Sequence, residues 1–221
     1  MVMSLTSPWG AGKTTFVKMW QQKLRNEGYR SLYFNAWEND FIDDPLIALV
    51  DEISLLIEED YGEVEGVGTD KLRDIKSIGA HIARRGVPVV LRLLSAGLID
   101  DEAVESIVGD GLATGAEDLF EAYRTDRNQV HEFRKTLQEI AESTTADRQG
   151  PVYFFIDELD RCRPDFAIEL MERVKHLFGV PGIVFILVTD PNQLQHSVRS
   201  LYGAGMDAKG YLRRFISLEY E

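Results

Sequence analysis

Ser7-Pro8-Trp9-Gly10-Ala11-Gly12-Lys13-Thr14-Thr15 is the stretch on which the fold prediction depends. It follows a short apolar start, residues 2–5, and precedes an amphipathic stretch, so the glycine-rich loop lies between a predicted strand and a predicted helix. Small residues let the backbone approach phosphate oxygens closely, and the N–H groups of a helix N-terminus attract them. The pattern therefore predicts a phosphate-binding loop, with an ordinary turn of the same composition as the alternative.

The residues of this loop have different predicted roles. We expect nucleotide contacts from Trp9, Gly10, Ala11, Gly12, Lys13, Thr14 and Thr15. The Lys13 ammonium would bridge the outer phosphates and support catalysis, and the Thr14 hydroxyl would bind Mg²⁺. Ser7 stands where the usual pattern G-x-x-x-x-G-K-[ST] has its first glycine, and serine adopts unusual backbone angles less readily. We therefore expect Ser7 to tune nucleotide affinity without excluding binding.

A second stretch carries a matching signal. Residues 152–156 form a continuous apolar run that ends abruptly in Asp157-Glu158, which is typical of a strand buried on both faces. An acid at the tip of such a strand can hold hydrated magnesium, and the next carboxylate can polarise an attacking water. We assign Asp157 to the metal and Glu158 to the general base. The alternative is a solvated acidic strand end.

Apolar runs and amphipathic stretches alternate along most of the chain. Predicted strands lie at residues 31–34, 183–188 and 215–220; predicted helices begin after the loop and at Asp44-Pro45, and cover residues 130–140, 166–177, 193–202 and 211–214. Such alternation predicts an α/β fold with a parallel sheet flanked by helices. Residues 61–122 lack it and are interpreted as a mainly helical insertion into a core of residues 1–60 and 123–221.

Composition limits the classes of function. The chain of 221 residues is 44% hydrophobic and has a formal net charge of -13, so it can bury a core but offers no broad nucleic-acid surface. Its single cysteine, Cys162, and the absence of a basic and apolar leader favour a cytoplasmic location. Residues 86–99 are apolar, but they include Arg92 and are shorter than the ~20 residues of a membrane span. Peripheral membrane contact through them stays open.

Four motifs together resemble the KAP family of P-loop NTPases. They are residues 8–14 (PWGAGKT), 34–38 (FNAWE), 155–162 (FIDELDRC) and 211–215 (YLRRF). The resemblance implies a Mg²⁺-dependent ATPase with an added strand between the loop strand and the acidic strand, and Thr189 or Asp190 at its tip. The family includes membrane-associated scaffolds and bacterial phage-exclusion proteins. The paired transmembrane helices of many members are not recognisable here, and relatives commonly continue past Phe215, which favours a partner protein or a further effector domain.

Charged and aromatic residues outside the two motifs suggest further roles. Arg213 or Arg214 of a neighbouring subunit could act as an arginine finger in a homo-oligomer, whereas exposed arginines are usually just solvated. Asp160, Arg161 and Arg163 could form an ion pair that orients Glu158, face another subunit, or be purely structural. We expect Trp37 to fill the junction beyond the second strand.

The preferred function is an ATP-hydrolysing switch or oligomerising regulator, with phage defence as one setting. ATP is favoured over GTP because the sequence has no Asn-Lys-x-Asp segment. A small-molecule or polynucleotide kinase is an alternative, for which Arg84-Arg85 in the predicted insertion is the one hint. A non-hydrolysing membrane-peripheral module, acting through residues 86–99, is the other.

Overall fold

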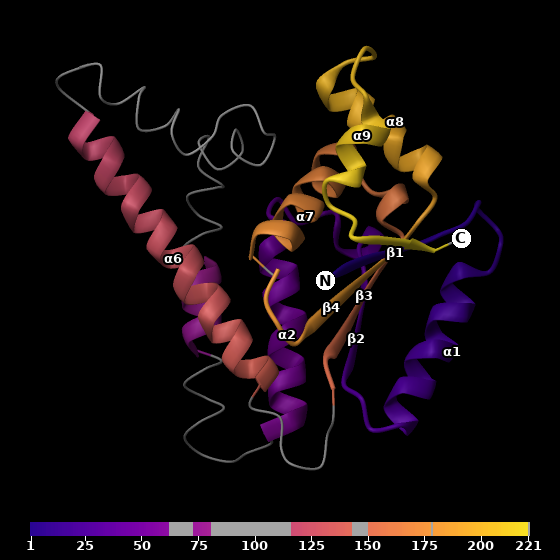
Figure 1. Ribbon diagram of the computed structural model, residues 1–221, viewed down its shortest axis with the longest axis horizontal. Coiled ribbons are helices and arrows are strands. Elements are labelled where there is room, and N and C mark those ends of the chain that lie inside the picture. Colours follow the sequence, from indigo (N-terminus) through magenta and orange to yellow (C-terminus); the bar gives the residue numbers. More distant parts are fainter. Residues whose placement is uncertain (62–72, 81–115, 143–149, 178, 221) are drawn as a thin grey trace.

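The computed structural model describes residues 1–61, 73–80, 116–142, 150–177 and 179–220 (Figure 1). The elements are, in chain order, β1 (Val2–Thr6), α1 (Lys13–Asn26), β2 (Ser31–Asn35), the 3₁₀ turn η1 (Trp37–Asn39), α2 (Pro45–Tyr61), α6 (Ala116–Glu142), β3 (Val152–Asp157), the 3₁₀ turn η2 (Leu159–Arg161), α7 (Pro164–Leu177), β4 (Ile183–Thr189), α8 (Pro191–Tyr202), α9 (Ala208–Arg213) and β5 (Leu218–Tyr220). Strands and helices alternate as the sequence predicts.

The five described strands form one parallel sheet in the order β2-β3-β4-β1-β5. This confirms the predicted α/β class, and β4 is the added strand that the family resemblance implies between β1 and β3. The register pairs Thr6 with Thr189 and Asn35 with Asp157. The carboxyl ends of four strands therefore meet at one edge, where ligands of open α/β sheets collect.

Helices cover both faces of the sheet (Figure 1). α1 packs on one face through Val17 and Leu24, against Phe155 of β3 and residues of β1 and β4. On the other face the larger core includes Phe154 of β3 with residues of α2, α7, α8 and α9. Adjacent residues of β3 thus enter opposite cores, which confirms that this strand is buried on both faces.

Local signals set the ends of the helices. α1 begins after Gly12, which has φ 84°, and α2 begins after Asp44, whose carboxylate accepts the N–H of Leu46 at 2.8 Å. The predicted last strand starts too early, since β5 begins at Leu218. Phe215 closes the turn that follows α9, where its N–H donates to Leu212 O at 3.1 Å and its ring packs 5.1 Å from that of Tyr211. Burial of this ring keeps residue 215 out of the strand.

Part of the predicted insertion packs on the core. Residues 73–80 are helical, Ile75 is completely buried, and Gly79 faces Val50 of α2 and Phe133 of α6. α6 is continuous from Ala116 to Glu142 and therefore crosses the predicted end of the insertion at residue 122. The division into core and insertion stays a prediction. The Arg84-Arg85 pair and residues 86–99 lie outside the described residues. No helix of the described part is long and apolar enough to cross a membrane.

Candidate functional site

The loop that joins β1 to α1 has the backbone form that its glycines allow. Gly10 and Gly12 have φ values of 81° and 84°, a region that residues with a Cβ rarely adopt. Ser7 is not at positive φ, and its N–H donates to Thr189 O at 3.3 Å. The serine therefore causes no left-handed strain, and the loop requires glycine only at positions 10 and 12.

Lys13 links the loop to the start of α1. Its Nζ donates to Ser7 O at 2.6 Å and to Pro8 O at 3.3 Å. An ammonium has three N–H bonds, so one remains for a phosphate oxygen. The first helical hydrogen bond runs from Phe16 N to Gly12 O, which leaves the N–H groups of Lys13, Thr14 and Thr15 without intrahelical acceptors. N–H groups in this position at a helix N-terminus are suited to bind an anion.

The acidic tip of β3 meets the same helix terminus. Thr14 Oγ1 donates to Glu158 Oε1 at 3.3 Å, across 144 residues of sequence. The side chain of Asp157 is buried and accepts two hydrogen bonds, from Tyr33 OH and from Glu158 N, both at 2.9 Å. The structure thus brings Thr14, Asp157 and Glu158 together at the edge of the sheet.

Glu158 has an unusual backbone. Its φ of 61° makes it the one non-glycine residue at positive φ among the described residues. Such conformations cost free energy and are concentrated at functional sites. Its Oε2 lies 2.7 Å from Arg161 Nε, so an ion pair between Arg161 and Glu158 is present, and whether it orients Glu158 for catalysis stays a prediction.

Two tryptophans lie near this edge. The indole N–H of Trp9 donates to Asp160 Oδ2, which ties the phosphate-binding loop to η2. A nucleotide contact of Trp9 stays a prediction. The prediction that Trp37 fills a junction is wrong, because its side chain is 51% exposed. The 3₁₀ turn at the end of β2 brings its ring within 5.6 Å of the Arg161 guanidinium.

Comparison with protein families agrees with this geometry. The family model described as KAP family P-loop domain matches residues 1–220. This chain belongs to the KAP family. A search of curated proteins found no match. The match includes both the loop and the acidic strand, and it assigns the chain to a nucleotide-binding P-loop NTPase family.

The donor set of this KAP domain suits Mg²⁺. The hydroxyl of Thr14 and the carboxylate of Asp157 are hard oxygen donors, which Mg²⁺ prefers. Among the described residues no group of three or more His, Cys, Asp or Glu side chains could hold a metal ion. Mg²⁺ in phosphoryl-transfer sites takes one or two protein ligands and completes its shell with phosphate and water. The site therefore fits a nucleotide-bound ion better than an all-protein cage.

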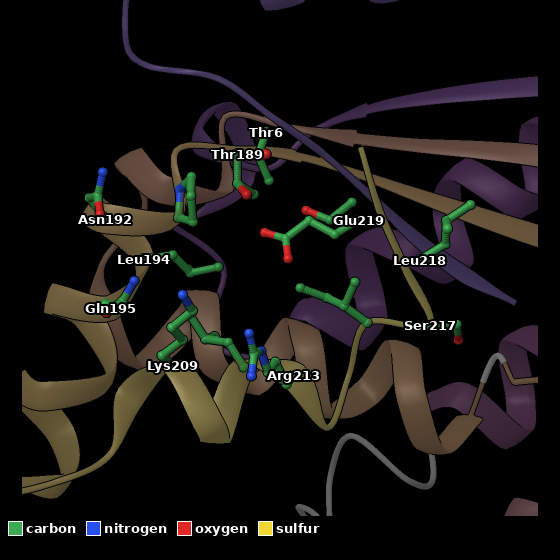
Figure 2. Close-up of a pocket in the computed structure, with 14 residues that line it drawn as sticks. Thr6, Thr189, Asn192, Leu194, Gln195, Lys209, Arg213, Ser217, Leu218 and Glu219 are labelled. Atoms are coloured by element: carbon green, nitrogen blue, oxygen red, sulfur yellow. The ribbon is translucent and has the colours of Figure 1, made fainter. Parts of the chain in front are cut away.

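The two arginines of α9 and its C-cap occupy different surroundings. Arg213 and Lys209 extend from α9 toward a cavity of about 400 Å³ that Thr6 and Thr189 also line (Figure 2). Within the described chain the side-chain partners of Thr14 and Glu158 do not include Arg213. Arg214 lies near Lys175, whose pKa is lowered by burial and then by the charge of Arg214. Either arginine would therefore have to act on the site of a second subunit, and this arginine-finger role stays a prediction.

Sequence reasoning missed Tyr33, which holds Asp157 from the neighbouring strand. The signal is visible only once the strand order is known. β2 pairs with β3 so that Asn35 lies opposite Asp157, and Tyr33 is two residues earlier on the same face. A tyrosine at that position reaches the carboxylate diagonally.

Proposed function

We propose that this KAP domain is a Mg²⁺-dependent ATPase that works as a nucleotide-controlled switch. The observation that carries the proposal is the hydrogen bond between Thr14 of the loop and Glu158 of β3. It joins a phosphate-binding element to a carboxylate that can serve as general base. Each motif alone could also be structural, as an ordinary turn or as a solvated acidic strand end. Their contact across 144 residues of sequence supports a shared site instead.

Each residue has a distinct proposed role. Lys13 uses its remaining N–H bond for the outer phosphates, and the N–H groups of the first turn of α1 bind the same oxygens. Thr14 can donate its hydroxyl proton to Glu158 while a lone pair on the same oxygen faces the metal. When bound, Mg²⁺ neutralises negative charge that develops on the β- and γ-phosphates. Asp157 would help to hold that ion, and Glu158 would accept the proton of the attacking water.

ATP is the proposed nucleotide, and the proposed output is a change in assembly or in the activity of a partner. The preference for ATP rests on the missing guanine-specific segment in the sequence. Phage defence as the setting rests on the family resemblance alone. The choice of ATP and the setting in phage defence do not affect the proposed roles of the site residues.

Three proteins test the chemistry: the wild type, Lys13→Ala and Glu158→Gln. We expect the wild type to release inorganic phosphate from MgATP, and Lys13→Ala to lose MgATP binding in calorimetry. Glu158→Gln should bind MgATP as the wild type does, with kcat lower by about 10²- to 10⁴-fold, the usual contribution of a general base. Lys23→Ala is the matched control, since Lys23 lies on the same helix with its side chain 73% exposed.

Equal turnover of wild type and Glu158→Gln would contradict the assigned base. The kinase alternative predicts phosphate transfer to an added acceptor in place of phosphate release, which product analysis with γ-labelled ATP separates. The membrane-module alternative predicts binding to lipid vesicles that does not depend on Glu158.

A further inference from the structure

Arg161 and Glu158 are brought together by the turn that follows β3. In a 3₁₀ turn the side chains at positions i and i+3 lie over one another. Glu158 precedes η2, Arg161 N donates to Glu158 O at 3.1 Å, and Arg161 Nε lies 2.7 Å from Glu158 Oε2. The Glu-Leu-Asp-Arg order after the strand thus places a guanidinium on the carboxylate proposed as the base.

The Trp37 ring also lies near that guanidinium. The Arg161 guanidinium carbon lies 5.6 Å from the centre of the Trp37 ring, within the range of a cation–π interaction. A planar guanidinium stacks on an aromatic face, which an ammonium does not reproduce. Trp37 follows β2, so a neighbouring strand end limits where Arg161 can lie.

The carboxylate of Glu158 is therefore held from two directions. Oε1 accepts a hydrogen bond from Thr14 at the start of α1, and Oε2 forms an ion pair with Arg161. A glutamate side chain loses rotamer freedom when it is fixed in one position. Fixing it before the nucleotide arrives removes that cost from the chemical step, where orientation controls rate.

We propose that Arg161 is the positioning residue for the general base Glu158, and that Trp37 positions Arg161. This inference rests on the proposed ATPase function. Arg161 does not need to touch the nucleotide in this role. Its removal should therefore lower kcat and leave nucleotide affinity unchanged.

The test is a double-mutant cycle on MgATP hydrolysis by the full chain. We expect Arg161→Ala to lower kcat about tenfold, a fraction of the 10²–10⁴ that a general base supplies, with Kd for MgATP within about twofold of wild type. Arg161→Lys should recover part of the loss because it keeps the positive charge but not the planar guanidinium. Trp37→Ala should lower kcat less than Arg161→Ala, and the double variant should be no slower than Arg161→Ala.

Phe41→Ala is the matched control, because Phe41 is 77% exposed on the segment that follows η1. Its kcat should equal that of wild type. Wild-type kcat in Arg161→Ala, a faster Arg161→Ala, or additive losses in the double variant would each overturn the inference while the proposed function stands. A wild type that shows no ATP hydrolysis overturns the proposed function and this inference together.

Discussion

The Asp157 carboxylate accepts one hydrogen bond on each oxygen, and both donors come from elements that the fold fixes. Glu158 N occupies Oδ1 and Tyr33 OH occupies Oδ2, each at 2.9 Å. Burial, followed by the nearby charge of Asp157, raises the pKa of Tyr33 well above its ordinary value of 10.0. The phenol therefore keeps its proton at neutral pH and remains a donor. Its effect is to fix the orientation of a carboxylate that we assign to Mg²⁺.

Tyr33→Phe removes this donor without changing the size of the ring. We expect the half-saturating Mg²⁺ concentration for ATP hydrolysis to rise about tenfold, because loss of an outer-shell partner typically weakens metal binding 10- to 100-fold. A Mg²⁺ titration of the initial rate at saturating ATP measures it. Tyr153→Phe on β3 is the control, since its ring packs at 5.7 Å against that of Tyr29. An unchanged Mg²⁺ requirement in Tyr33→Phe would mean that the phenol does not orient Asp157.

At the residue scale, the sequence predicts what depends on local chemistry. Gly10 and Gly12 have positive φ where the loop pattern places them, and Cys162 is buried as its residue type indicates. Tyr33 and Trp37 could not be predicted, because their contacts depend on which strand lies beside β3. The number of residues between two positions gives no information about pairing between strands far apart in the chain.

At the element scale, the Asp44 carboxylate caps the start of α2 and also links α2 to α7. Asp44 caps α2, and its Oδ2 lies 2.6 Å from a guanidinium nitrogen of Arg173 on α7. Arg173 is only 1% exposed and also pairs with Glu169 at 3.1 Å. Because a buried guanidinium cannot lose its proton, its stability depends on these two carboxylates.

Asp44→Ala should destabilise the fold more than the loss of a helix cap. We expect the free energy of unfolding to fall by about 3–5 kcal/mol, the cost of breaking a buried ion pair, against about 1 kcal/mol for a cap alone. Asp44→Asn keeps an N-capping side chain and should lose less. Urea unfolding followed by circular dichroism gives both values, with the exposed Asp43→Ala as control. A loss of under about 1 kcal/mol in Asp44→Ala would show that Glu169 alone sustains Arg173.

The existence of the elements is well predicted, and their order in space is not. Apolar periodicity and the Asp44-Pro45 cap predict α2, and the continuous apolar run predicts β3. Periodicity does not say that β4 lies between β1 and β3, which came from the family resemblance. The start of β5 is missed because burial of Phe215 against Tyr211 is a tertiary contact.

At the scale of the whole molecule, the site is built from three strand ends on one edge of the sheet, whereas Arg213 and Arg214 come from α9 and its C-cap (Figure 1). Both arginines are exposed. We propose that these exposed cations, on a molecule of net charge -13, act on the phosphates bound in the site of a second copy. An arginine supplied across a subunit interface can raise hydrolysis by 10³- to 10⁵-fold.

Complementation between two inactive variants tests this arrangement. The Arg213→Ala/Arg214→Ala variant keeps the loop and the base but lacks the finger, and Lys13→Ala keeps the arginines but cannot bind ATP. If the finger acts in trans, mixing the two should give a turnover above the sum of the separate rates, and the gain should rise with total protein concentration. Mixing the double arginine variant with a Lys13→Ala/Arg213→Ala/Arg214→Ala triple variant should give no gain. Turnover equal to the sum in the first mixture, with wild-type-like hydrolysis by the double arginine variant alone, would place the arginines outside the reaction, because a finger worth 10³-fold could not be removed without effect.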